Sequence, residues 1–408
     1  MKGGTKIRTL KFLFLTSYYP PYHLGGDATH VKYLAEELAN KGHEVHILHS
    51  LDAYRIKRKN FDVLEQEPDK KNIFIHRIKS PLNQMDPLMA YTLGFSFYVQ
   101  KKFLEVIKEV DPNVVHHHNI SLLGYSILEK KDNYLSLYTA HDYWLICQTN
   151  NLLRNKRKIC VHKNCYSCAV ICKRIPQIWR QFKGFEKAIK NIDLMISPSD
   201  FVRTRILKEI ELKSCTIPNF APQPPNNIDP SVFLNYFLFV GMLEPHKGIL
   251  HLLAMFNELR SDLKTKLIVV GGGSLDAYVK AYISKNSLAE KVIFLGFVTQ
   301  EILYSLYSNA LALIVPSIWP ENAPLVVLEA LSVGTPVIVS NRGGLPEIVS
   351  KIDKSLIFTD FVDLRNVLLS FDKSAFNSSK VKKIFQDNYS AESYVNKYLK
   401  IVNSSRNC

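Results

Sequence analysis

Long apolar runs are missing from this sequence of 408 residues. No stretch reaches the roughly 18 uncharged apolar residues that a membrane-spanning helix needs. The basic start of the chain resembles a signal peptide, but its apolar part, Phe12 to Leu15, is shorter than the roughly 7–15 residues of such a segment. No small-residue cleavage site follows it. We therefore predict a cytoplasmic protein whose first apolar run is a β-strand.

The glycine fingerprint G-x-G-x-x-G is also absent, which disfavours a dinucleotide-dependent oxidoreductase. Internal repeats and low-complexity tracts are missing as well. The chain is 47% hydrophobic and 22% charged, so a largely disordered protein is excluded. At about 100–200 residues per domain, its length predicts two domains.

Acidic residues are scarce in the first half of the chain. Residues 1–220 carry 34 Lys and Arg against 21 Asp and Glu, whereas the remainder carries 18 against 16. Within 147–191, 11 basic residues stand against Glu186 alone. Such a surface attracts anions, which could be nucleic acid, acidic lipid headgroups or a phosphorylated substrate. A solvated basic surface without any partner is the alternative.

Short apolar runs alternate with amphipathic segments along the chain, a pattern typical of parallel α/β sheets. The runs cover residues 10–15, 44–48, 113–115, 134–139, 194–197, 237–240, 266–270, 291–295, 311–315 and 336–340. The stretch 217–230 is rich in proline and is typical of a linker. We predict a first lobe of residues 1–218, a linker of 219–230, a second lobe of 231–388 and a final helix of 389–408 that can pack back on the first lobe.

Open α/β sheets bind ligands beyond the carboxyl ends of their strands, so the loops there are expected to carry the chemistry. Gly25 and Gly26 follow the first strand and open a helix, where backbone N–H groups can approach a phosphate. A ligand-free tight turn would use the same pair. His141 follows a later strand beside Asp142 and is a candidate for the cleft. Histidines 116–118 lack the spacing of a helical metal pair, and we interpret most of them as structural.

The second half of the chain contains the most specific segment. Lys247 stands near the start of a helix, where it suits a diphosphate, and Gly272 lies in a glycine turn that is weak evidence alone. Glu321 and Glu329 are eight residues apart, about two helical turns, with almost wholly apolar residues between them. A buried carboxylate without a partner is costly, so this pair indicates a polar ligand such as a phosphorylated sugar.

Taken in order, these motifs resemble the retaining glycosyltransferases of family 4. The matching pieces run along nearly the whole chain: YPPYHLGG, NVVHHHN, TAHDYW, ISPSDFVR, IPNF, FVGMLEPHKG, VVGGGS and PENAPLVVLEALSVGTPVIVSNRGGLPEIV. The resemblance implies the α/β GT-B fold, two Rossmann-like parallel-sheet lobes facing across a cleft. It also implies transfer of a sugar from a nucleoside-diphosphate donor to a glycan or lipid-linked acceptor, in cell-surface polysaccharide or glycolipid synthesis. No cofactor is required for that catalysis.

The resemblance assigns roles by position. It makes His141 and Glu321 catalytic, with His141 near the transferred sugar and Glu321 on its hydroxyls, while Glu329 holds the ribose. The donor-binding set that it implies is Gly25, Gly26, Lys247, Gly272, Asn322, Ala323, Pro324, Leu325, Val326 and Glu329.

One residue departs from the family pattern. Met242 stands where the family usually has the Arg that serves as a second diphosphate cation. Either Arg203, Arg342 or His246 substitutes for it, or turnover is weaker, and a donor-binding but inactive homologue is one alternative. A nucleotide-sugar epimerase or phosphorylase on the same architecture is another. A nucleic-acid-binding protein would give the two glutamates no role, so we expect no nucleic acid partner.

Five of the seven cysteines fall within 26 residues, in a basic insert of residues 147–173. They are Cys147, Cys160, Cys165, Cys168 and Cys172. In a chain without an export signal this cluster favours metal ligation over disulfides. Only one close C-x2-C pair exists, so a structural zinc ion and reduced packing thiols both stay open, with an iron–sulfur cluster or a disulfide less favoured. His162 is a further candidate ligand.

Residues 175–190 have apolar side chains at three- and four-residue steps and cations between them, which predicts a basic amphipathic helix. Such a helix suits an anionic lipid surface, although any helix covering the sheet of the first lobe has the same stripe. The hypothesis is peripheral attachment to the inner face of a membrane.

Overall fold

Apolar runs form the centres of two parallel sheets in the computed structural model, which describes residues 9–23, 25–57, 70–154, 158–160, 165–229 and 233–406. The sheet of the first lobe has the strand order β3-β2-β1-β4-β5-β8-β9. Its strands are β1 (Lys11–Leu15), β2 (Glu44–Ser50), β3 (Ile73–Ile78), β4 (Val114–His117), β5 (Leu135–Thr139), β8 (Leu194–Ser197) and β9 (Ser214–Thr216). A small antiparallel hairpin, β6 (Leu153–Arg154) with β7 (Lys158–Ile159), stands apart from it.

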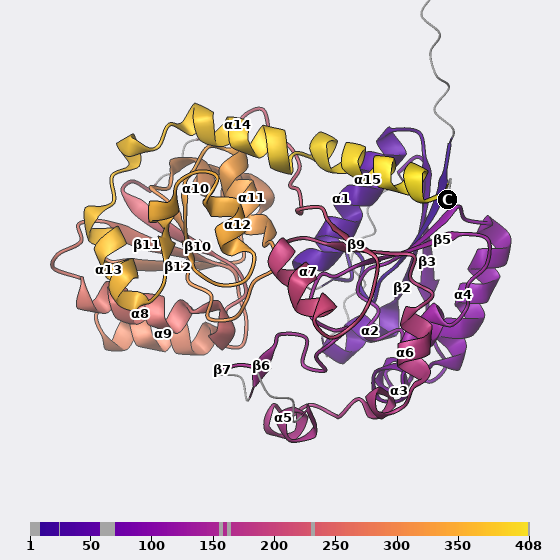
Figure 1. The fold of residues 1–408 in the computed structure, drawn as a ribbon. Coiled ribbons are helices and arrows are strands. Elements are labelled where there is room, and N and C mark those ends of the chain that lie inside the picture. Colours follow the sequence, from indigo (N-terminus) through magenta and orange to yellow (C-terminus); the bar gives the residue numbers. More distant parts are fainter. Residues whose placement is uncertain are drawn as a thin grey trace, which may run out of the picture.

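The sheet of the second lobe has the order β12-β11-β10-β13-β14-β15. Its strands are β10 (Tyr236–Val240), β11 (Lys266–Val270), β12 (Val292–Gly296), β13 (Leu313–Val315), β14 (Val337–Ser340) and β15 (Ile357–Phe358). All of their pairings are parallel, and Leu238 is in register with Leu313. The two lobes lie side by side, the second on the left of Figure 1. The predicted two-lobe α/β fold of the GT-B type is confirmed.

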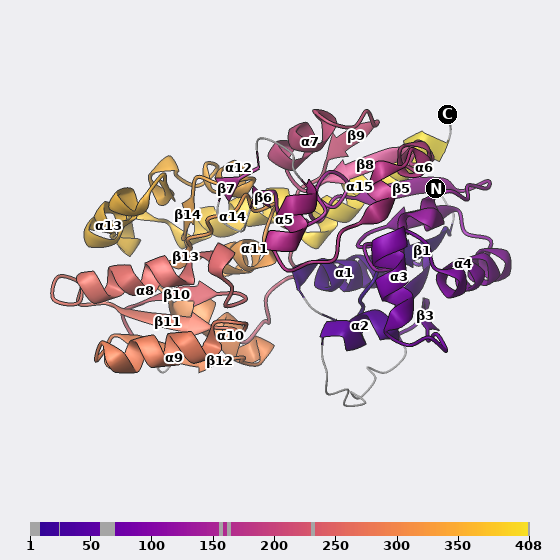
Figure 2. The same ribbon diagram turned by 90° about the horizontal axis from the view of Figure 1, so that it is seen from below.

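Helices cover the sheets of both lobes (Figures 1 and 2). Those of the first lobe are α1 (Gly26–Asn40), α2 (Leu51–Lys57), α3 (Met85–Leu93), α4 (Phe97–Val110), α5 (Cys165–Ile171), α6 (Gly184–Ile189) and α7 (Asp200–Leu207). Those that follow are α8 (Ile249–Glu258), α9 (Asp276–Lys285), α10 (Gln300–Asn309), α11 (Leu325–Ser332), α12 (Leu345–Val349), α13 (Phe361–Ser370), α14 (Ser378–Tyr389) and α15 (Ala391–Arg406).

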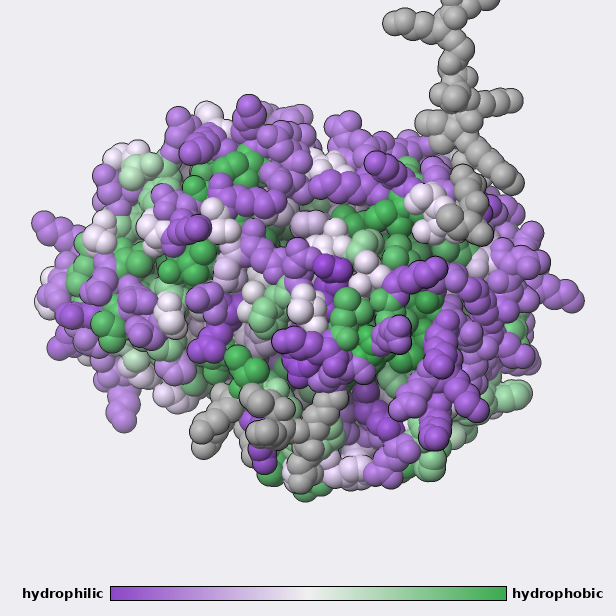
Figure 3. Space-filling model, in the orientation of Figure 1, coloured by the Kyte–Doolittle hydropathy of each residue, from purple (hydrophilic) through white to green (hydrophobic). Residues whose placement is uncertain are grey.

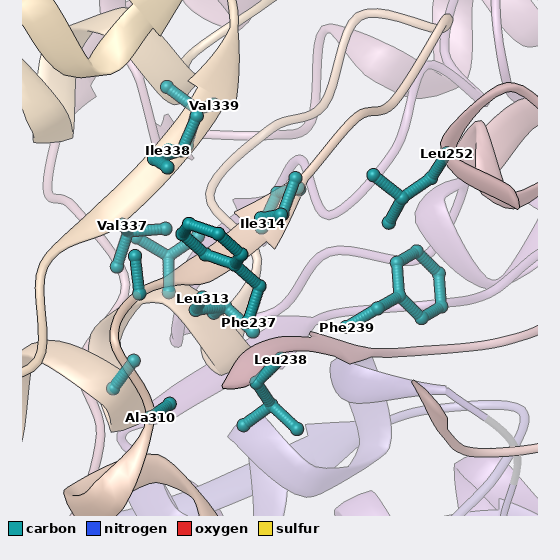
Figure 4. Packing of buried hydrophobic residues seen from close by; sticks show 14 of the residues in the cluster. Phe237, Leu238, Phe239, Leu252, Ala310, Leu313, Ile314, Val337, Ile338 and Val339 are labelled. Atoms are coloured by element: carbon teal, nitrogen blue, oxygen red, sulfur yellow. The ribbon is translucent and has the colours of Figure 1, made fainter. Parts of the chain in front are cut away.

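The central strands are buried because helices pack on both faces of each sheet. In the second lobe, Phe237 and Phe239 of β10 lie among Ile314 of β13, Val337 of β14 and Leu252 of α8 (Figure 4). A strand buried on both faces has a continuous rather than an alternating apolar pattern. Hydrophilic residues cover most of the face shown in Figure 3, and hydrophobic residues form separate smaller areas on it.

The last helix, α15, crosses from the second lobe back to the first (Figure 1). It contacts α1 and β5, and Tyr394, Val395 and Tyr398 are buried in the core of the first lobe. The chain therefore contributes its own C-terminal residues to the lobe that begins it.

Residues 175–190 do not form the predicted continuous helix. A 3₁₀-helix, η2 (Ile178–Gln181), and α6 are separated by the extended backbone of Phe182. Trp179 and Phe185 are buried in the first lobe, whereas Ile178 and Phe182 point to the outside. Arg180, expected on a solvated face, is half-buried instead and donates hydrogen bonds to the carbonyl oxygens of residues 144 and 145.

Candidate functional site

A pocket of about 290 Å³ lies between the lobes. Its walls are the loops that follow β1, β5, β10 and β13. In each sheet the strand order reverses at the first of its strands, between β1 and β4 and between β10 and β13, which is where open α/β sheets bind ligands. Ten of the residues predicted from sequence line it: Gly25, Gly26, His141, Lys247, Glu321, Asn322, Ala323, Pro324, Leu325 and Val326.

Two predicted residues do not line this pocket. Gly272 is a buried loop glycine whose carbonyl accepts a hydrogen bond from the Leu243 N–H, and a Cβ there would lie 2.5 Å from the ring of Phe297. Glu329 lies on α11 and accepts a hydrogen bond of 3.0 Å from the Tyr307 hydroxyl. Because α11 begins only at Leu325, Glu329 lies little more than one turn into the helix rather than two.

A buried ion pair forms the second-lobe wall of the pocket. The Glu321 Oε1 atom lies 2.7 Å from the Lys247 ammonium and 2.6 Å from the Ser317 hydroxyl. Burial alone would raise the pKa of Glu321, but the Lys247 charge and these hydrogen bonds outweigh it and hold the pKa below its usual value. Glu321 is therefore an ionised carboxylate, and Lys247 also lies 5.1 Å from the centre of the Trp319 ring.

His141 forms the opposite wall and belongs to a buried row of histidines. Its Nε2 atom lies 2.9 Å from Nδ1 of His118, and its ring centre is 5.1 Å from that of His30. The next ring in the row, His116, hydrogen-bonds the Tyr398 hydroxyl of α15 at 3.0 Å. Burial lowers the pKa of His141 to about 4, although the nearby Asp27 carboxylate raises it. His141 is therefore a neutral hydrogen-bonding group at pH 7, not a cation.

Sequence reasoning missed Asp27 of this wall and His118, which lies behind it. Asp27 lines the pocket directly after Gly26, and its Oδ2 atom accepts a hydrogen bond of 2.6 Å from Asn119. The sequence pattern that could have indicated Asp27 is a carboxylate directly after a glycine pair at the start of a helix. His118 was interpreted as structural with its neighbours, yet it is the direct partner of His141.

Several hydrogen bonds connect the lobes around the pocket. The Asn322 side-chain amide donates to the His141 carbonyl, and the Tyr143 hydroxyl donates to the Pro320 carbonyl at 3.2 Å. The Asn219 amide donates to the Ala323 carbonyl at 2.9 Å. Away from the pocket, the Glu347 carboxylate accepts the first N–H groups of α7 at 2.7 and 2.8 Å.

The substitutes suggested for the missing arginine do not stand at the pocket. Met242 lines it, but Arg203 and Arg342 do not, and Arg203 pairs with Asp200 at 3.2 Å. Burial, with the Lys247 charge second, lowers the pKa of His246 to about 4, so this ring is neutral at pH 7. Among the described residues that line the pocket, Lys247 is the only permanently cationic side chain.

The cysteines form a separate group on the first lobe. Cys147, Cys160, Cys165 and Cys168 line one small cavity of about 20 Å³, and Cys172 lies outside it. Among the described residues, no three His, Cys, Asp or Glu side chains stand close enough to form an assembled metal-binding group. His162 lies outside the described residues. None of the described helices is long and apolar enough to cross a membrane.

Two family models match most of the chain between them. The model described as Glycosyltransferase Family 4 matches residues 24–222, and that described as Glycosyl transferases group 1 matches residues 230–363. An uncharacterized glycosyltransferase of Methanocaldococcus jannaschii is 26% identical over 347 residues, 83% of either chain. The MMP alpha-(1->4)-mannosyltransferase of Mycolicibacterium hassiacum is 24% identical over 356 residues, 82% of either chain.

Solved structures share the arrangement of the two lobes. Sucrose-phosphate synthase from Thermosynechococcus elongatus superposes with a TM-score of 0.70 at 19% identity, covering 97% of this chain and 98% of that one. Anabaena HepE in complex with UDP and glucose superposes with a TM-score of 0.65 at 16% identity, covering 97% of this chain and all of the other.

Proposed function

Because this chain belongs to the family-4 glycosyltransferases of the GT-B fold, we propose that it transfers a hexose from a nucleoside-diphosphate sugar to its acceptor with retention of anomeric configuration. The acceptor that we propose is a glycan or a lipid-linked sugar of cell-surface polysaccharide or glycolipid synthesis. Mannosyltransferases acting on O-antigen chains are among the relatives, which supports that direction.

The observation that carries the proposal is the Lys247–Glu321 pair facing His141 across one pocket. A diphosphate leaving group needs a cation, which Lys247 supplies, and the start of α11 adds backbone N–H groups at Leu325 and Val326. Sugar hydroxyls need acceptors, which Glu321 supplies, and the neutral His141 ring is placed to hydrogen-bond the transferred sugar. The HepE complex with UDP and glucose supports a nucleotide-sugar donor.

The test of the reaction is made with and without acceptor. Purified protein is ranked against UDP-, GDP- and TDP-sugars by thermal shift, and the best donor is then incubated with candidate acceptors. Transfer should depend on the acceptor, and NMR should show the donor's anomeric configuration in the product. Turnover of the donor sugar without acceptor would indicate an epimerase, and binding without turnover would indicate an inactive homologue.

Glu329 does not line the pocket, but the family resemblance assigns it to the donor ribose. If it binds the ribose, Glu329→Ala should weaken donor binding more than it slows turnover, because that contact is made equally in the ground and transition states. We expect KM for the donor to rise about tenfold, with kcat changing less. His141→Ala should instead lower kcat, because this side chain faces the reacting sugar. Glu258→Ala, an exposed carboxylate of the same lobe, is the matched control. Full activity of the His141 variant would contradict the site assignment.

We also propose that the first lobe binds an acidic membrane through an apolar surface within residues 170–182. Val170, Ile171, Ile175, Ile178 and Phe182 are all exposed large apolar side chains of this surface. Lys173 and Arg174 lie between them in the chain and Lys183 follows. This surface continues toward α3, which contacts η2 and lies on the same lower side of the lobe as α5 in Figure 1. Cations beside exposed apolar side chains favour anionic lipid over a neutral partner.

Co-sedimentation with vesicles tests this placement. We expect binding to vesicles that contain phosphatidylglycerol, loss of that binding in high salt, and little binding to phosphatidylcholine alone. Phe182→Ser combined with Ile178→Ser should reduce the bound fraction severalfold. Phe297→Ser, on the second lobe and more exposed (77%) than Phe182 (62%), should leave it unchanged. Equal binding to neutral and acidic vesicles, or none to either, would reject the proposal.

A further inference from the structure

Four cysteine side chains from three separate chain segments surround one cavity in the first lobe. Cys147 ends the loop that carries His141, and Cys160 follows the β6–β7 hairpin. Cys165 and Cys168 lie in the first turn of α5, three residues apart and hence on one face of the helix. The cavity that they line measures about 20 Å³, room for a single small occupant.

We propose that Cys147, Cys160, Cys165 and Cys168 bind one structural zinc ion. Four thiolates arranged tetrahedrally are the usual ligand set of a structural zinc site, with one close C-x2-C pair among them. This inference goes beyond the glycosyl transfer proposed above and does not depend on it.

The described part of the insert around these cysteines has short regular elements and few buried side chains. The strands of its hairpin have two residues each, and Ala169 is the only buried residue of α5. A unit of this size cannot bury enough apolar surface to order itself and usually needs a metal or a disulfide. Two of the hydrogen bonds in its described part run beside the cysteines: the Cys160 N–H donates to the Leu152 carbonyl at 2.7 Å, and the Gln148 amide donates to the Cys165 carbonyl.

Zinc binding requires the four thiols to move inward, because they are not yet within the spacing of an assembled metal group. Each Zn–S bond is about 2.3 Å long, so ligation would contract the cavity and order the insert at the same time. Up to four protons leave as Zn²⁺ binds four thiols, and the resulting centre carries two negative charges. The 11 basic residues of 147–191 match that charge.

The neighbouring Cys172 is not part of the proposed site. Its Sγ atom lies 4.0 Å from that of Cys168, about twice the length of a disulfide bond, which excludes a disulfide between them but not a shared metal ion. Cys172 is left out of the site because it does not line the cavity. Substituting Cys172, which directly follows α5, therefore tests whether the metal depends on the four proposed ligands alone.

The zinc site would also stabilise the loop that positions His141. Cys147 comes six residues after His141, and residues 142–150, which include it, are folded back on themselves. The Asn150 amide donates to the Asp142 carboxylate at 2.9 Å, and the Tyr143 N–H donates to the Asn150 carbonyl at 3.1 Å. Loss of the metal is thus expected to loosen the first-lobe wall of the pocket.

The experiment measures metal content in the full-length protein purified under reducing conditions without chelator. We expect about one zinc per chain by elemental analysis, and a fall of at least fivefold in Cys160→Ser and in Cys165→Ser. Cys215→Ser, a change in β9 far from the cluster in sequence, and Cys172→Ser should keep the metal. Cobalt loaded into chelator-treated wild-type protein should give the intense visible bands of tetrahedral thiolate coordination, a readout that needs no folded variant.

Removal of the metal supplies an independent measurement. Chelation should lower the melting temperature by several degrees, and added Zn²⁺ should restore it. Metal-free protein with unchanged stability would overturn the proposal in favour of reduced packing thiols. Iron together with inorganic sulfide would overturn it in favour of an iron–sulfur cluster, and loss of zinc from Cys172→Ser would refute the ligand set.

Discussion

Lys247→Ala should lower kcat/KM for the donor by about 10²–10³-fold, the usual cost of removing one charge-stabilising group from a transition state. The effect is expected to be large because no other permanent cation lines the pocket among the residues that the structure describes. In the reaction proposed above, Lys247 stabilises the departing diphosphate without the second cation that the family usually has. The loss should appear mainly in kcat, because charge on the leaving group grows as the sugar departs.

The converse change is Met242→Arg, which restores a cation at the position where the family usually has an arginine. Met242 lines the pocket and is 46% exposed, so a longer side chain has room there. One new charge-assisted hydrogen bond is worth about 1.5–3 kcal/mol, so kcat/KM should rise about tenfold or more. In the double variant the added arginine should recover part of the activity lost with Lys247.

Lys247→Ala also leaves the buried carboxylate of Glu321 without its cation, which destabilises the fold. Melting temperatures are therefore measured for every variant, and Lys247→Arg, which keeps the charge, is the matched control. Unchanged steady-state kinetics in a folded Lys247→Ala protein would remove this residue from the site.

Acidification should unfold this protein between about pH 6 and 4. Burial lowers the pKa values of His49 and His117 to about 3 and those of His141 and His246 to about 4, and it holds three more histidines well below the ordinary 6.5. The unfolded chain takes up protons at these positions as the pH falls below 6.5, whereas the folded protein does not until its own pKa values are reached. Stability therefore decreases as pH decreases across this window.

The expected loss of unfolding free energy is about 1.4 kcal/mol for each pH unit and each such histidine. Asp142 acts in the opposite direction, because burial raises its pKa to about 7 and favours the folded protein as the pH falls toward 3.8. Counting the four histidines whose pKa lies near 3 or 4 and subtracting Asp142, the net loss between pH 6 and 5 is about 4 kcal/mol, a large part of the stability of an ordinary domain.

Chemical denaturation at a series of pH values measures this slope. His117→Phe, at a fully buried position on β4, removes one titrating ring and should reduce the slope by about one proton. Stability that stays constant from pH 7 to 4.5 would show that these rings are protonated as easily in the folded protein as in the unfolded chain.

The fold could be predicted from the sequence because continuous apolar runs mark strands that are buried on both faces. Every predicted run overlaps a strand of the two sheets. The missed strands have weaker patterns: β3 mixes His76 and Arg77 with apolar residues, and β9 and β15 have three and two residues. The prediction of one helix over 175–190 is wrong. Periodicity indicates which residues would share a helix face, but it does not show that the backbone is helical throughout. Phe182 interrupts the predicted helix.

The pocket could be predicted where a residue follows a strand and carries its own chemistry, as His141 and Glu321 do. The sequence could not predict residues whose role depends on tertiary contacts. His118 becomes important only because β4 and β5 are neighbours, which places its ring against that of His141. The sequence shows that Met242 replaces the family arginine. It does not show that Arg203 and Arg342 lie away from the pocket and so cannot supply the missing cation there.

The return of α15 to the first lobe means that the chain passes between the lobes twice. The two passages touch: Ala221 pairs with Ser390 in an isolated parallel bridge, and the Ala221 N–H donates to the Tyr389 carbonyl at 3.2 Å. One flexible connection would allow the lobes to rotate relative to each other about any axis. Two connections that contact each other restrict this motion mainly to rotation about a single axis. If the chain transfers sugar as proposed, we expect such a hinge to open the pocket for donor exchange and to return Lys247 and His141 to the same alignment at each closure.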